Sequence, residues 1–241
     1  MIRRIISLFT ELYNRSSEVK YINYLRKKGV KIGQNTSILS PNHSLIDTGR
    51  ASWIEIGDNC ILTHGVSLIA HDYSWSILRK SHNIMAPTGG GKIKIGNNVF
   101  IGVNSIVLRN VTIGDNCIIG VGSVVCSSIP ANSVAAGNPC KVIMSLDEFC
   151  EKRKKNILKE AALEALHIMK EKGRVPTEME MRRWGFLYNT KNPEIINKLT
   201  ALGDDREEFV KSYLSQEAVF DNYDSFLEYV KENNTNENNP L

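Results

Sequence analysis

The chain has 241 residues, a formal net charge of +4 and 42% hydrophobic residues, which allows one substantial core and a smaller accessory unit. The charge is small and spread over both signs, so nucleic acid, which needs clustered Lys and Arg, is not an expected partner. No apolar run reaches the roughly 20 residues of a transmembrane helix. Because the five cysteines are odd in number and no cleavable signal precedes them, we expect a cytoplasmic protein.

The first 29 residues carry a helical pattern, and a second helical stretch within them ends at Gly29. We predict one or two short helices that form an N-terminal cap, residues 1–29, over the region that follows. The basic start, with Arg3 and Arg4, leaves contact with a membrane surface as an alternative. The apolar residues at helical spacing are Ile2, Ile5, Ile6, Phe9 and Leu12.

A six-residue repeat dominates the middle of the chain. Six residues hold a strand of about three residues and a corner, so three such segments close a triangular coil of about eighteen. Small residues such as Ser105 and Cys117 are expected to share the narrow interior, and Asn and Gly to form the corners. Weaker copies begin near residue 30, which predicts a solenoid over residues 30–143. The strongest aliphatic positions are Ile95, Ile101, Val107, Ile113, Ile119 and Val125.

The repeat is interrupted once. One coil from Ile56 should lead to residue 74, but the strong repeat resumes at residue 95, which leaves an excursion of 21 residues (95 − 74 = 21) at about 74–94. Long loops that leave a compact repeat are more often functional than accidental.

After Ile143 the composition becomes rich in Glu, Lys, Ala and Leu, which predicts a C-terminal helical extension over residues 144–232. Shorter helices are predicted at 176–184, 193–202, 205–214 and 225–231, and residues 233–241 are expected to be disordered. The aromatic residues of the extension favour a local core, with an acceptor pocket or contact with a partner as the alternatives. The predicted apolar stripe of its first helix is Ile157, Leu158, Ala161, Ala162, Ala165, Leu166 and Met169.

Four segments of the repeat carry specific motifs: Ile95–Gly102, Val111–Asn116, Ile119–Val125 and Val134–Ile143. In these segments the chain resembles the hexapeptide-repeat acyltransferases, especially the maltose, galactoside and polysaccharide O-acetyltransferases. The resemblance implies a mainly β protein, a left-handed parallel β-helix, which assembles as a homotrimer and binds acetyl-CoA between subunits. Left-handed crossovers are rare among folds, and the repeat by itself does not reveal handedness, trimer or cofactor.

Acetyl transfer to a hydroxyl needs a base, and histidine has a suitable pKa near neutral pH. The resemblance places the catalytic histidine just before an extended loop, which selects His71 as the general base. His64 at a corner and His82 within the excursion are weaker candidates, and we assign no role to His43 or His167.

The resemblance also implies the cofactor contacts. Val103 would donate its backbone N–H to the thioester oxygen as a catalytic group, and Lys141 would lie near the nucleotide phosphate. The complete implied set for acetyl-CoA is Gly102, Val103, Gly120, Val121, Cys126 and Lys141. Each glycine among them is equally explained by packing or by a corner. Cys60 and Cys117 are interpreted as core residues, and no metal is expected.

The sequence therefore predicts an acetyl-CoA-dependent O-acetyltransferase acting on a sugar or polysaccharide precursor. An N-acetyltransferase of an amino sugar, nucleotide sugar or antibiotic is the alternative, because the same histidine suits an amine. A zinc carbonic anhydrase built on a related solenoid needs three converging histidines, and no histidine occurs between Thr88 and Asn156. A solenoid without enzyme activity is the remaining alternative.

Overall fold

The computed structural model describes residues 13–87, 89–200 and 206–233. The chain divides into two compact units, Met1–Phe149 and Cys150–Leu241. We refer to them as the prism unit and the helical unit. The domain boundaries expected from the sequence remain predictions. The first predicted helix and residues 234–241 of the tail predicted at 233–241 lie outside the described residues, and Asn233 is the last residue of helix α7 (Tyr223–Asn233).

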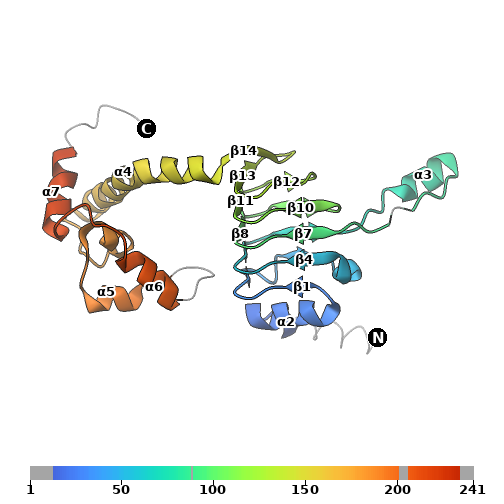
Figure 1. Cartoon of the computed structure of the whole chain (residues 1–241), viewed down its shortest axis with the longest axis horizontal. Helices are drawn as coiled ribbons and strands as arrows, with labels where there is room; N and C mark the ends of the chain where they lie inside the picture. The colour runs from blue at the N-terminus through green and yellow to red at the C-terminus, as the bar shows by residue number, and fades with distance from the viewer. Residues whose placement is uncertain (1–12, 88, 201–205, 234–241) are drawn as a thin grey trace. The chain divides into compact units, whose positions relative to one another are not determined.

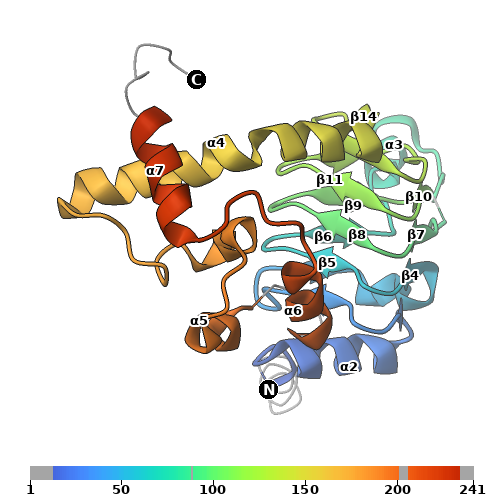
Figure 2. The ribbon, with the colours of Figure 1, turned by 60° about the vertical axis from the view of Figure 1, so that its left-hand side comes forward.

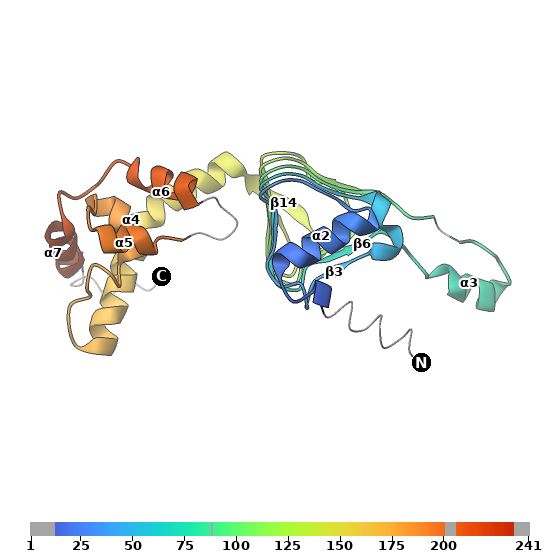
Figure 3. The same cartoon turned by 90° about the horizontal axis from the view of Figure 1, so that it is seen from below.

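Short strands build the prism unit, in three sheets whose strands are parallel except for the last (Figure 1). Up to β13 (Ser133–Ala136), successive strands along the chain enter different sheets, so three strands make one coil, and the view along the stack is a triangle (Figure 3). Sheet A contains β1 (Lys31–Ile32), β4 (Ile54–Ile56), β7 (Ile93–Ile95) and β10 (Val111–Ile113). Sheet B contains β2 (Ser37–Ile38), β5 (Ile61–Leu62), β8 (Val99–Ile101), β11 (Cys117–Ile119), β13 (Ser133–Ala136) and the antiparallel β14 (Lys141–Ser145). Sheet C contains β3 (Leu45–Ile46), β6 (Ser67–Ile69), β9 (Ile106–Leu108) and β12 (Val124–Val125).

The pairing register measures the repeat directly. Ile93 pairs with Val111 one coil further along, the same step that separates Asn98 from its hydrogen-bond partner Asn116. Ile54 pairs with Ile93 across the excursion. The number of residues from Ile54 to Ile93 exceeds that of a regular coil by 21, the excursion length predicted from the sequence. The strands above and below the excursion therefore stay in register, and Figure 2 shows them in one stack.

The interior and the corners follow the repeat. The aliphatic residue of each six-residue step is at most 1% exposed from Ile95 to Val125. The small interior residues are also buried, and Ser105 Oγ donates to the Gly120 carbonyl at 2.9 Å, which satisfies its hydroxyl. Asn98 and Asn116 take φ near +55° at one corner, and the amide of Asn98 donates to Asn116 at 2.8 Å. Asparagine tolerates this left-handed backbone better than most residues do.

Helix α2 (Glu18–Lys28) packs on the first coil of the prism. Ser17 caps its first turn by accepting from the Lys20 N–H, and Gly29 ends it with φ of +105°. Tyr21, Ile22 and Leu25 are buried in the same apolar core as the strands. The helix thus covers apolar side chains that the first coil would otherwise expose to water.

The excursion leaves sheet C after β6 and contains helix α3 (Trp75–His82), none of whose residues is buried. Its two ends meet, because the Gly91 N–H donates to the Ala70 carbonyl at 3.0 Å. Figure 1 shows the helix standing away from the strands. A short 3₁₀ helix, η1 (Thr48–Trp53), links β3 to β4.

The helical unit is built from α4 (Leu146–Lys172), whose first four residues belong to the prism unit, then η2 (Arg182–Tyr188), α5 (Pro193–Lys198), α6 (Arg206–Leu214) and α7 (Tyr223–Asn233). Its core includes Ala161, Ala165, Trp184, Tyr188 and Phe226, so aromatic residues of the extension pack locally. Within the described residues, none of the helices combines the length and apolarity needed to cross a bilayer.

The helix predicted at 176–184 is wrong. The chain makes a turn and then the 3₁₀ helix η2. Glu180 fixes the turn by accepting from the Thr177 N–H at 2.7 Å and from Arg174 at 2.9 Å. In η2, Gly185 packs so tightly that an added Cβ would lie 2.2 Å from Oη of Tyr213. Tertiary contacts therefore override the helical signal of Pro176 and the residues that follow.

Candidate active site

His71 and Asp47 form a close polar pair on sheet C. Asp47 follows β3 and His71 follows β6, and these two strands are neighbours in the sheet. Nδ1 of His71 lies 2.5 Å from Oδ2 of Asp47. The Asp47 side chain is 8% exposed and that of His71 is 35% exposed. A buried carboxylate thus holds one ring nitrogen, and the other edge of the imidazole is left to accept or give a proton.

Asp47 is itself held in place. Its Oδ1 accepts from the Gly49 N–H at 3.1 Å, at the start of η1. Its own N–H donates to the Leu68 carbonyl at 3.1 Å. Both carboxylate oxygens of Asp47 therefore have hydrogen-bond partners. The pairing of β3 with β6 fixes where Asp47 stands relative to His71.

The residues next to His71 tie the start of the excursion to the prism. The Tyr73 ring lies 4.7 Å from the His71 ring between centroids. Asp72 pairs with Arg109, just after β9, at 3.5 Å. Hydrogen bonds from Ser74 first, and then the nearby Arg109 charge, lower the pKa of Asp72. The ionised Asp72 therefore helps to hold the segment that carries His71.

A second group of candidate residues lies at the corner between sheets B and C. Ile38 pairs with Leu62, which pairs with Ile101, which pairs with Ile119. The residue two positions after each of these four residues lies at the same corner of its coil. Together these residues form a line along the stack, which we call the corner column. The corner column consists of Ser40, His64, Val103 and Val121. Backbone hydrogen bonds join neighbouring coils at this corner, since the N–H of Asn104 donates to the His64 carbonyl at 2.9 Å and the N–H of Gly122 donates to the Val103 carbonyl at 2.8 Å.

The glycines beside the corner column are required by packing. A Cβ on Gly102 would lie 2.6 Å from the Val121 nitrogen, and one on Gly120 would lie 2.8 Å from the Ala136 Cβ. Such contacts are too short for real atoms. The presence of these glycines therefore gives no evidence of cofactor binding.

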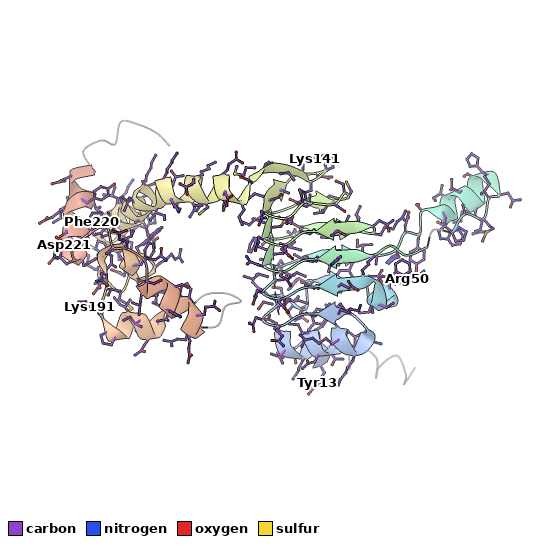
Figure 4. The ribbon with its side chains drawn as sticks, in the orientation of Figure 1. Tyr13, Arg50, Lys141, Lys191, Phe220 and Asp221 are labelled. Carbon is purple, nitrogen blue, oxygen red and sulfur yellow. The ribbon has the colours of Figure 1, made fainter. Side chains whose placement is uncertain are left out.

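The other implied cofactor residues lie elsewhere on the prism. Cys126 follows β12 in sheet C and is exposed. Lys141 begins β14 and is also exposed, at the end of the prism away from Tyr13 (Figure 4). Among the implied contacts, only the glycines and valines at 102, 103, 120 and 121 are brought together at one corner.

His71 and the corner column lie at opposite ends of sheet C. In the same coil, His64 precedes β6 and His71 follows it. The three-residue strand β6 lies between them, and a strand of that length spans about 10 Å. One chain therefore does not bring the imidazole of His71 to the Val103 N–H.

The remaining histidines are distributed over three places. The His43 and His64 rings lie 4.3 Å apart between centroids, and Nδ1 of His64 lies 3.2 Å from Oγ of Ser40. His82 lies on α3 beside Ser81, and His167 lies on α4, 4.0 Å from Glu171. Among the described residues, no three His, Cys, Asp or Glu side chains gather as a metal site would require.

The cysteines fit the core interpretation. Cys60 and Cys117 are at most 1% exposed, and burial raises the pKa of both thiols. Their sulfurs donate to backbone carbonyls of Gly96 and Pro130 at 3.0 and 3.1 Å. A neutral, buried thiol is a poor nucleophile.

Comparison with known proteins places this geometry in a family. The family model for the bacterial transferase hexapeptide, with six repeats, matches residues 92–127. Protein CapG of Staphylococcus aureus is 43% identical over 143 residues, which cover 59% of this chain and 79% of that protein. The chain belongs to the hexapeptide-repeat acetyltransferases. The family and the enzyme class predicted from the sequence are thereby confirmed.

Two further similarities are to galactoside acetyltransferases. The galactoside O-acetyltransferase of Escherichia coli (strain K12) is 39% identical over 97 residues, 39% of this chain and 45% of that protein. The solved structure of a galactoside acetyltransferase in complex with coenzyme A is 30% identical, covers 60% of this chain and 80% of that chain, and gives a TM-score of 0.45. The assignment of this hexapeptide-repeat acetyltransferase rests on the sequence matches.

Proposed function

We propose that this hexapeptide-repeat acetyltransferase transfers an acetyl group from acetyl-CoA to a hydroxyl of a sugar or polysaccharide precursor. The observation that carries the proposal is the His71–Asp47 pair, a partly exposed imidazole oriented by a buried carboxylate. A relative named galactoside O-acetyltransferase supports a sugar hydroxyl as the acceptor. Acetyl-CoA supplies an activated thioester, so a base and an oxyanion donor suffice for transfer.

The proposed reaction is a direct transfer. His71 removes the proton from the acceptor hydroxyl through Nε2, and the oxygen attacks the thioester carbonyl carbon. The Val103 N–H donates to the oxyanion that forms. When the carbon–sulfur bond breaks, His71 returns the proton to the departing sulfur. Asp47 keeps the proton of the neutral ring on Nδ1 and stabilises the imidazolium.

The separation of His71 and Val103 across sheet C implies that the reaction needs an oligomer. His71 and Val103 lie at opposite ends of that sheet in one chain, so a site using both takes each from a different copy. We therefore propose a homotrimer of left-handed β-helices with the sites between neighbouring subunits. Cyclic symmetry supplies three identical interfaces of this kind.

The acceptor class is tested by following thiol release from acetyl-CoA with a panel of sugars. Neutral sugars, uronic acids and amino sugars are assayed with the purified chain, and the products are analysed by mass spectrometry and by ester hydrolysis at alkaline pH. We expect an alkali-labile O-acetyl product. An alkali-stable product on an amino sugar alone would replace the hydroxyl acceptor with an amine, and no thiol release with any acceptor would contradict the proposed activity.

The role of Asp47 gives a separate prediction. Asp47→Asn should lower kcat by about 10- to 100-fold, because the amide no longer stabilises the imidazolium and can favour the wrong ring tautomer. The KM for acetyl-CoA should stay within about twofold, since Asp47 contacts His71 and is not among the residues implied to hold the cofactor. Asp72→Asn is the comparison variant, because Asp72 is adjacent to His71 and holds its segment through Arg109; it should lower kcat less than Asp47→Asn does. Equal losses in both variants would show that Asp47 has no special role.

A further inference from the structure

We propose that Ser40, His43 and His64 form the acceptor subsite, which holds a sugar ring next to the transferred acetyl group. This inference rests on the proposed function and specifies where its acceptor binds. It uses the polar cluster that the proposed reaction leaves unassigned, at the part of the prism closest to α2.

The corner column gives the subsite its position. Neighbouring coils of a parallel stack are about 4.8 Å apart. His64 therefore lies one coil from Val103, and Ser40 lies two coils, or about 10 Å, from it. Val121 lies on the other side of Val103, where the cofactor is proposed. A thioester at Val103 thus has the cofactor on one side and the Ser40–His64 cluster on the other, with room for one pyranose ring along the corner.

The chemistry of the cluster suits a polyhydroxyl ligand. Nδ1 of His64 is paired with Ser40 Oγ at 3.2 Å, and the His43 ring lies against the His64 ring at 4.3 Å with a tilt of 33°. Both histidines are exposed and Ser40 is partly exposed. Imidazole nitrogens and a hydroxyl both donate and accept hydrogen bonds. They match the alternating donors and acceptors of sugar hydroxyls.

The turn that carries Ser40 and His43 is held in shape before any ligand binds. The N–H groups of His43 and Ser44 both donate to the Ser40 carbonyl at 3.0 Å. The Arg15 guanidinium donates to the Pro41 carbonyl and, at 3.1 Å, to the Ser44 carbonyl. A fixed turn reduces the conformational entropy that binding would otherwise cost.

A pocket adjoins the cluster. It has a volume of about 380 Å³ and is lined by residues 15–18 and 39–43. The lining includes the Ser40 and His43 positions, together with the charged Arg15 and Glu18. Small-molecule sites commonly start near this size, and its polar lining fits a sugar better than an apolar ligand. A second sugar residue of an oligosaccharide would extend into this pocket.

The test compares His43→Ala and His64→Ala with the intact enzyme, using the best acceptor from the thiol-release panel. Each substitution should raise the acceptor KM about tenfold, the effect of one lost hydrogen bond of ordinary strength. The kcat at saturating acceptor, the KM for acetyl-CoA and the slow hydrolysis of acetyl-CoA without acceptor should each change less than about twofold. His64→Gln, which keeps a donor and an acceptor, should recover part of the acceptor affinity. His82→Ala on α3 is the control and should leave the acceptor KM unchanged.

The outcomes separate this inference from the proposed function. If the intact enzyme turns over but both Ala variants keep the acceptor KM, the subsite is wrong and the proposed activity stands. If the acetyl-CoA KM rises instead, the cluster contacts the cofactor and the inference fails. An equal fall of kcat in both variants, with acceptor KM unchanged, also contradicts it. If the intact enzyme releases no thiol with any acceptor, the proposed function itself fails.

Discussion

His71→Ala is expected to lower kcat by about 10²- to 10³-fold, since the acceptor hydroxyl then loses its general base. The substitution removes a side chain that is 35% exposed, so the free energy of unfolding should change little. The KM for acetyl-CoA should also stay within about twofold, because the proposed role of His71 is to move the acceptor proton and not to hold the cofactor. The measurement is thiol release under saturating acetyl-CoA, with the thermal unfolding midpoint determined in parallel.

His82→Ala is the matched control for His71→Ala. His82 is an exposed histidine on the same excursion and pairs only locally with Ser81. We expect it to keep the turnover of the intact enzyme within about twofold. If His71→Ala retained near full turnover, or if His82→Ala lost as much as His71→Ala, His71 would not be the base.

Mixed oligomers should recover activity that neither parent has. Val103→Pro removes the proposed oxyanion N–H and should by itself lower kcat by about 10²-fold or more. In a trimer containing His71→Ala and Val103→Pro chains, one of the three interfaces combines an intact His71 with an intact Val103. Trimers that carry both chain types should therefore show about one third of the intact turnover.

The experiment uses two affinity tags, one on each variant, and purification over both in succession. Trimers of a single variant, purified in the same way, provide the background. Circular dichroism and the unfolding midpoint show whether Val103→Pro keeps the prism. Absence of recovery in properly folded mixed trimers would mean that each site is built within a single chain. Recovery of one half would indicate a dimer rather than a trimer.

The prism could be predicted from the sequence because its determinants are local. A buried aliphatic residue every sixth position, a small interior residue and an Asn or Gly corner repeat along the chain, and each coil stacks on the one before it. Asn98 and Asn116 illustrate the point, since the same residue at the same step takes the same positive φ. The excursion could be counted as well, because it interrupts an otherwise constant period.

Asp47 could not be selected in the same way. The step from Asp47 to His71 is longer than the regular coil that separates Asn98 from Asn116. The strands that carry the pair are also further apart in the chain than one regular coil, since Ile46 pairs with Leu68. The first coils contain extra residues that break the six-residue period. Counting back from His71 by one regular coil therefore does not lead to Asp47. An acidic residue just after a strand of the preceding coil was the only signal available.

The core of the helical unit and the geometry of η2 could not be predicted from the sequence for a different reason. Its core joins residues far apart in the chain, such as Ala161 of α4, Trp184 of η2 and Phe226 of α7. Helix propensity acts over a few residues and says nothing about such contacts. The start of α4 was visible in the composition, but the 3₁₀ geometry around Gly185 depends on Tyr213 and Thr190.

Because the two ends of the excursion are joined at its base, its length and sequence can change without altering the coils on either side. The chain leaves at Ala70 and returns at Gly91, where one backbone hydrogen bond joins the two ends, and the strands on either side keep their pairing. The cost of closing a loop grows only slowly with its length. The segment beyond His71 can therefore be lengthened, shortened or replaced without refolding the coils, because the coils on either side are joined independently of what lies between Ala70 and Gly91.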